Sequence, residues 1–136
     1  MGESLNVLVC DDSLGFPTLV QTWLREDGRF TVVGLATGGE EAKAMVAEHR
    51  PDLIVLDLVL PDAPDSPKLV AALRALHLPL RVLLVSSMHG ERLEAAAQAA
   101  GADGFCSKGA KPEELTGSLF AIASDDGSSS TQSPLP

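Results

Sequence analysis

The chain has 136 residues, of which 45% are hydrophobic, and a formal net charge of −9. That length suits one domain, which buries roughly two thirds of the surface that the unfolded chain exposes. Because 10 basic residues face 19 acidic ones and form no cluster, the composition argues against direct nucleic-acid binding. The longest apolar stretch, Leu53–Leu60, is interrupted by Asp57 and is far shorter than the roughly 20 residues of a membrane span.

The N-terminus lacks the basic segment that opens a signal peptide. The two cysteines, Cys10 and Cys106, each lie within an apolar run, which is typical of buried thiols in a reducing compartment. We therefore expect a cytoplasmic protein without a membrane segment.

Apolar runs alternate with helical patterns along the chain. The runs rich in Val, Leu and Ile, and the shorter run that carries Phe105, predict strands over Leu5–Cys10, Phe30–Leu35, Asp52–Leu56, Arg81–Val85 and Gly104–Ser107. Between and after them, apolar spacing, proline near helix starts and glycine after helix ends predict helices over Pro17–Asp27, Gly39–His49, Lys68–Leu76, Glu91–Ala100 and Lys111–Ala123. Five strand–helix units in succession predict an α/β fold with an open, doubly wound parallel sheet.

We predict one domain over residues 4–123. Residues 124–136 are rich in Ser, Asp and Pro and have no helical periodicity, so we expect a disordered tail or the stub of a linker.

Polar side chains follow the predicted strands at the edge where doubly wound sheets bind ligands. The list is Asp11 and Asp12 after the first strand, Asp57 after the third, Ser86 after the fourth and Lys108 after the fifth. Each residue alone has an ordinary explanation as a cap or a surface charge. Asp57 is the exception, because it lies within an apolar run where an unpaired charge costs several kcal/mol.

Three neighbouring carboxylates repel one another, and a hard divalent cation such as Mg²⁺ relieves that repulsion through oxygen ligands. No Cys or His joins this group, so the residues disfavour zinc. A carboxylate beside Mg²⁺, an ammonium and a hydroxyl is equipped to attack a phosphoryl group. A sugar-cleaving carboxylate pair is disfavoured because one Trp and no Tyr leave few stacking surfaces. There is neither a Gly-x-Gly-x-x-Gly motif nor a P-loop.

Four motifs in this order resemble the receiver (phosphoacceptor) domain of two-component response regulators. They are Val9-Cys10-Asp11-Asp12-Ser13, Asp57-Leu58-Val59-Leu60-Pro61, Val85-Ser86-Ser87 and Phe105-Cys106-Ser107-Lys108. The segments Thr31-Val32-Val33-Gly34 and Gly39-Glu40-Glu41-Ala42 look like receivers of nitrate-regulator-like DNA-binding regulators and of chemotaxis methylesterases. The resemblance implies a flavodoxin-like sheet with strand order 2-1-3-4-5.

The resemblance also implies roles for the residues at the sheet edge. Asp57 would accept a phosphoryl group from a histidine kinase, with Lys108 and Ser86 each binding one phosphoryl oxygen. The metal ligands would be Asp57, Asp12 directly, Asp11 mainly through water, and the backbone carbonyl of Val59. Phe105 stands where the family has its switch aromatic, although core packing explains it equally well. The domain would catalyse its own phosphoryl transfer and dephosphorylation rather than turn over a substrate.

Two departures from the family pattern concern backbone geometry. The loop Pro61–Pro67 has no glycine, and Lys108-Gly109 replaces the common Lys-Pro. Because Cys10 and Cys106 belong to strands three positions apart, about 14 Å, we predict two free thiols.

The leading hypothesis is a phosphorylation-activated switch whose partners are a histidine kinase or phosphotransfer protein and a downstream effector. One alternative is an interaction module of the same fold that works without phosphorylation. Another is that the chain is the receiver fragment of a larger transcription regulator. A homodimer also stays open, because the last predicted helix carries four large apolar residues, Leu115, Leu119, Phe120 and Ile122.

Overall fold

A computed structural model describes residues 4–77 and 79–124. Its elements are β1 (Leu5–Cys10), α1 (Phe16–Asp27), β2 (Phe30–Ala36), α2 (Gly39–His49), β3 (Leu53–Asp57), α3 (Ser66–Leu76), β4 (Arg81–Ser86), α4 (Gly90–Ala100), β5 (Gly104–Ser107) and α5 (Pro112–Ser124). Every predicted strand and helix is present, and no end differs from its prediction by more than two residues. The predicted tail begins with Ser124, which is the last residue of α5, and continues over 125–136, outside the described residues.

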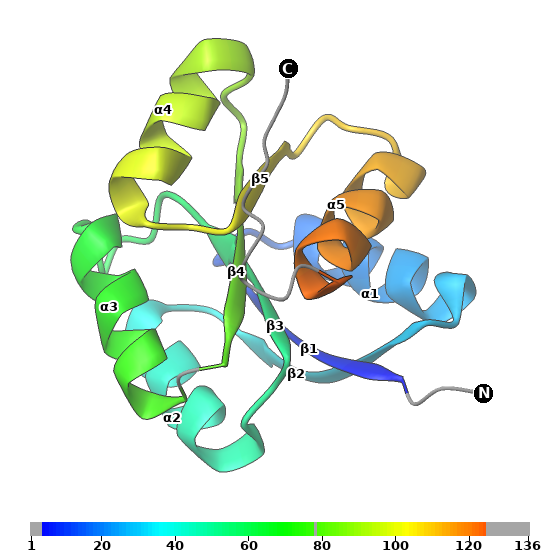
Figure 1. Cartoon of the computed structure of the whole chain (residues 1–136), viewed down its shortest axis with the longest axis horizontal. Coiled ribbons are helices and arrows are strands. Elements are labelled where there is room, and N and C mark those ends of the chain that lie inside the picture. The colour runs from blue at the N-terminus through cyan, green and yellow to red at the C-terminus, as the bar shows by residue number, and fades with distance from the viewer. Residues whose placement is uncertain (1–3, 78, 125–136) are drawn as a thin grey trace.

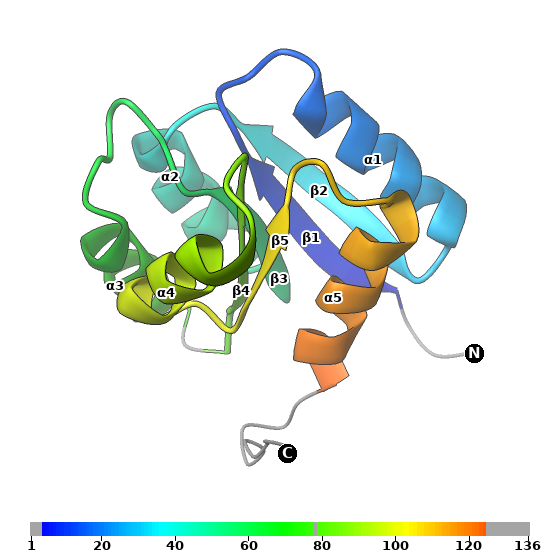
Figure 2. The ribbon, with the colours of Figure 1, turned by 90° about the horizontal axis from the view of Figure 1, so that it is seen from above.

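All five strands run parallel in the order β2-β1-β3-β4-β5, so the flavodoxin-like topology is confirmed. Figures 1 and 2 show α1 and α5 on one face of the sheet and α2, α3 and α4 on the other. This arrangement places the carboxyl ends of all strands at one edge of the sheet.

The core consists of two apolar layers, one on each face of the sheet. Successive residues of a strand point to opposite faces, and β3 is buried along its whole length. Leu53 and Val55 pack with the buried residues of α1 and α5, whereas Ile54 and Leu56 pack with those of α2, α3 and α4. β3 therefore delivers Asp57 to the sheet edge from the centre of the molecule.

Both cysteines are free and buried, as predicted. Cys10 is on β1 and Cys106 is on β5, and β3 and β4 lie between those strands. Within the described residues every peptide bond is trans, including the one between Lys108 and Gly109.

No helix in the described part of the chain combines the length and the apolar character that crossing a membrane requires.

Candidate functional site

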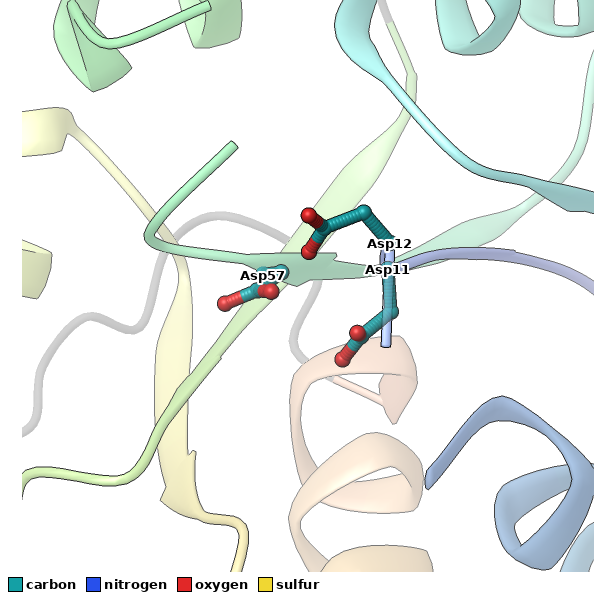
Figure 3. Close-up of side chains that lie close together, drawn as sticks. All are labelled: Asp11, Asp12 and Asp57. Carbon is teal, nitrogen blue, oxygen red and sulfur yellow. The ribbon is translucent and has the colours of Figure 1, made fainter. Parts of the chain in front are cut away.

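Three carboxylates meet at the carboxyl edge of the sheet. Asp11 and Asp12 directly follow β1, and Asp57 ends the neighbouring strand β3. One oxygen atom from each of the three lies within 4.8 Å of the others. Figure 3 shows the three side chains close together. Asp11 and Asp57 are buried, whereas Asp12 is exposed to solvent. The sequence prediction that these three residues converge is confirmed.

Lys108 follows β5 and reaches this cluster with its side chain. Its Nζ atom lies 2.8 Å from Asp11 Oδ2 and 3.2 Å from Asp57 Oδ2. The contact with Asp57 is also a hydrogen bond, whereas the closer contact with Asp11 is an ion pair without a well-directed hydrogen bond. The backbone N–H of Lys108 donates to the carbonyl of Ser86 at 2.8 Å, which fixes the chain just after β5 against the end of β4.

Backbone and hydroxyl groups orient the two buried carboxylates. Asp11 Oδ1 accepts hydrogen bonds from the backbone N–H of Ser13 at 2.8 Å and from its hydroxyl at 2.6 Å. Asp57 Oδ1 accepts from the backbone N–H of Val59 at 3.1 Å. In both cases the donor lies two residues after the aspartate, which is the geometry of an Asx turn.

The electrostatics of the cluster set the two buried carboxylates apart. Burial raises the pKa of Asp57 above its ordinary value, and the nearby charge of Asp11 acts in the same direction. Burial also opposes ionisation of Asp11, but the Lys108 ammonium and the hydrogen bonds from Ser13 outweigh it and lower the pKa of Asp11. The Lys108 pKa is raised, because its two carboxylate partners outweigh the cost of burying the ammonium. Of the two buried carboxylates, Asp57 is thus the one that less favours carrying a charge without further compensation.

The residues present fit a hard divalent cation. Three carboxylates and one ammonium leave two uncompensated negative charges. The cluster of Asp11, Asp12 and Asp57 contains only oxygen donors, which suits Mg²⁺ and disfavours zinc. A cation of charge two would balance the site.

The remaining predicted site residues lie on β4, in the loop after β3 and on β5. Ser86 is buried at the end of β4, where its hydroxyl oxygen accepts a hydrogen bond from the backbone N–H of Met88 at 3.1 Å. Val59 is exposed in the loop after β3. Phe105 is 38% exposed on β5, so it is not an ordinary core residue, and with His89 it lines a hollow of about 410 Å³ between α4 and α5.

Two residues near the site were not predicted from the sequence. The ring of Phe16 lies beside the Lys108 ammonium. Asp62, in the loop after β3, accepts hydrogen bonds from the first turn of α2. The adjacent glycines Gly38 and Gly39 are the sequence signal for the second contact, since close approach of two backbone segments favours residues without a Cβ.

Comparison with known proteins decides the family. The family model "Response regulator receiver domain" matches residues 7–120. The chain belongs to the response regulator receiver domain family. The signal receiver domain of the response regulator NarL from Mycobacterium tuberculosis superposes with a TM-score of 0.81 at 33% identity, over 90% of this chain and 98% of that domain.

Curated relatives include a response regulator and a methylesterase. The chain is 32% identical to response regulator Rre1 of Synechocystis over 118 residues, which are 85% of this chain and 50% of Rre1. It is 37% identical to a protein-glutamate methylesterase/protein-glutamine glutaminase of Methanospirillum hungatei over 106 residues, which are 76% of this chain and 31% of that protein. This receiver domain therefore spans about half or less of the length of these relatives.

Proposed function

We propose that this receiver domain is a phosphorylation-activated switch, in which Asp57 accepts a phosphoryl group from the phosphohistidine of a histidine kinase or phosphotransfer protein. The observation that carries the proposal is the buried Asp57 carboxylate, placed within a cluster of two further carboxylates and 3.2 Å from the Lys108 ammonium. A carboxylate in that setting is a poised nucleophile next to a cation that stabilises developing negative charge.

In the proposed reaction an oxygen of Asp57 forms a bond to phosphorus while the bond between phosphorus and the donor's imidazole nitrogen breaks. The electron pair of that bond stays on the imidazole nitrogen, and the ring leaves as neutral imidazole because its other nitrogen carries a proton during the transfer. Lys108 would bind one oxygen of the transferred group and Ser86 another. Asp11, Asp12, Asp57 and the backbone carbonyl of Val59 would hold Mg²⁺. When bound, the ion would neutralise charge on the phosphoryl oxygens.

The switch would begin at Ser86. Its hydroxyl oxygen accepts from the backbone N–H of Met88, so a turn of the hydroxyl toward a phosphoryl oxygen would shift the segment between β4 and α4. Phe105 lies on the neighbouring strand and is partly exposed, so its ring has room to change position with that segment. An effector protein or domain would then bind the altered face.

Two alternatives follow from specific observations. In relatives such as Rre1 and NarL the matched region is about half of the protein, which supports a receiver that belongs to a larger regulator, for example a transcriptional regulatory protein of the NarL kind. A module that works without phosphorylation keeps the fold but has no need of Lys108 beside Asp57. We place the reaction in the cytoplasm, where a kinase would supply the phosphoryl group.

Phosphorylation with acetyl phosphate and Mg²⁺ tests the proposal. The unsubstituted protein should incorporate phosphate, and Asp57→Asn should not. Asp65→Asn is the matched control, because it makes the same change to an exposed aspartate before α3, where asparagine caps a helix equally well, and it should be labelled normally. Undiminished labelling of Asp57→Asn, or none of the unsubstituted protein, would overturn the proposal. Phosphotransfer from a panel of purified histidine kinases would then identify the donor.

A further inference from the structure

The Lys108 ammonium lies 5.3 Å from the centroid of the Phe16 ring. An ammonium within about 6 Å of the face of an aromatic ring is attracted by the ring's quadrupole. We infer that Phe16 is a positioning residue for phosphoryl transfer, which holds the Lys108 ammonium at the phosphoacceptor through a cation–π interaction. This inference rests on the proposed function of Asp57.

The Phe16 ring is fixed independently of Lys108. Phe16 is the first residue of α1, and Pro17 restrains the backbone directly after it. The ring meets Trp23 edge to face, with centroids 6.3 Å apart and planes at 86°, and it packs against the apolar layer beneath α1 and α5. A lysine side chain is flexible and its ammonium is strongly hydrated, so a fixed ring face restricts where the ammonium settles.

Among the described partners of the Lys108 ammonium, the Phe16 ring is the one that neither accepts the phosphoryl group nor is proposed to bind Mg²⁺. The other partners are the carboxylates of Asp11 and Asp57, and a phosphoryl group on Asp57 alters the contact on that side. Only 20% of the Lys108 side chain is exposed, and a cation–π contact is stronger when it is shielded from water. Phe16 can therefore keep the ammonium within reach of the phosphoryl group before and after transfer.

Fluorination of the ring separates this role from simple packing. Mono-, di- and trifluorophenylalanine at position 16 progressively weaken the ring's quadrupole and change its shape little. If the cation–π contact positions Lys108, the rate of phosphorylation by acetyl phosphate should fall with each fluorine, by about three- to tenfold across the series. If Phe16 only fills space, the rate should stay level.

The same series at Phe120 is the matched control. The Arg29 guanidinium lies 4.3 Å from the Phe120 ring centroid. Fluorination there weakens a cation–π contact that involves neither Lys108 nor the three carboxylates of the site. We expect no change in phosphorylation rate from this second series. Equal falls at both positions would overturn the inference, as would a level series at position 16.

A spectroscopic measurement reports the contact without the reaction. Ring-current shifts should move the Lys108 Hε resonances upfield, and Phe16→Leu should abolish that displacement while Phe120→Leu retains it. Lys108 resonances that do not respond to Phe16→Leu would overturn the inference even if the protein is phosphorylated. An unsubstituted protein that takes up no phosphate would instead overturn the proposed function.

Discussion

The Asp62 carboxylate accepts a hydrogen bond of 2.8 Å from the backbone N–H of Gly39, the first residue of α2. Its other oxygen accepts from the backbone N–H of Glu40 at 3.2 Å. These bonds keep the pKa of Asp62 below its ordinary value. Asp62 thus supplies from another loop the side-chain cap that the residue before α2, Gly38, lacks. The contact ties the loop that carries Val59 to the start of α2.

Two glycine-to-alanine substitutions should change the free energy of unfolding in opposite directions, one at this close approach and one in open space. A Cβ at Gly39 would lie 2.7 Å from the Cβ of Ala63, so Gly39→Ala should lower the free energy of unfolding by about 1–3 kcal/mol. A Cβ at Gly117 in α5 meets no atom within 4 Å, so Gly117→Ala should raise it by about 0.5–1 kcal/mol. Urea denaturation measures both, and a Gly39→Ala protein as stable as the unsubstituted chain would contradict the packing of this loop.

Mg²⁺ should stabilise the folded protein, because it relieves repulsion among the three carboxylates. A ligand that binds only the native state at 100 times its Kd adds about 2.7 kcal/mol to the free energy of unfolding. Thermal melting with and without Mg²⁺ should show this increment in the unsubstituted protein and lose most of it in Asp12→Ala. Asp65→Ala removes a carboxylate that caps α3, so it should lower the melting temperature but leave the Mg²⁺ increment unchanged. An Asp12→Ala protein with the full increment would argue against the site.

Neither cysteine should react with a thiol reagent in the native protein at pH 8. Burial, with the nearby charge of Asp57, raises the pKa of Cys10 to about 12, and burial also raises the pKa of Cys106. The thiolate is the reactive form, and a raised pKa means that it forms only at higher pH. Ellman's reagent should therefore detect two thiols after unfolding and none rapidly before it. Rapid reaction of either thiol in the native protein would show that its surroundings are more open than described.

Dephosphorylation should be slow. The side chains two positions after Asp57 and two after Ser86 are Val59 and Met88, and neither can orient a water molecule by hydrogen bonding. Val59 is 68% exposed, so a polar side chain at that position would have access to water. Val59→Asn combined with Met88→Glu should speed phosphate loss by about 10- to 100-fold. The decay is followed after the donor is removed, and equal rates in the two proteins would show that these side chains only cover the loop.

The fold and the carboxylate cluster could be predicted because both follow from the order of elements along the chain. Five apolar runs separated by helical patterns fix a parallel sheet, and a parallel sheet brings the ends of its strands together. Asp11, Asp12, Asp57 and Lys108 each directly follow or end such a run, so their convergence needs no knowledge of side-chain packing.

The contacts that were missed depend on packing between loops and helices. Whether Phe16 faces Lys108 depends on where α1 lies on the sheet and on the edge-to-face contact with Trp23, and neither is encoded in apolar spacing. The prolines of the segment Pro61–Pro67 indicate a stiff loop, but they do not show which backbone amides the Asp62 carboxylate meets.

Locating the phosphoryl group on the protein tests the central claim most directly. The protein is treated with acetyl phosphate and Mg²⁺, the acyl phosphate is reduced with borohydride, and mass spectrometry of the peptides identifies the reduced aspartate. The proposed function predicts modification of Asp57 alone. Modification of another residue in place of Asp57, or no modification under these conditions, would contradict it.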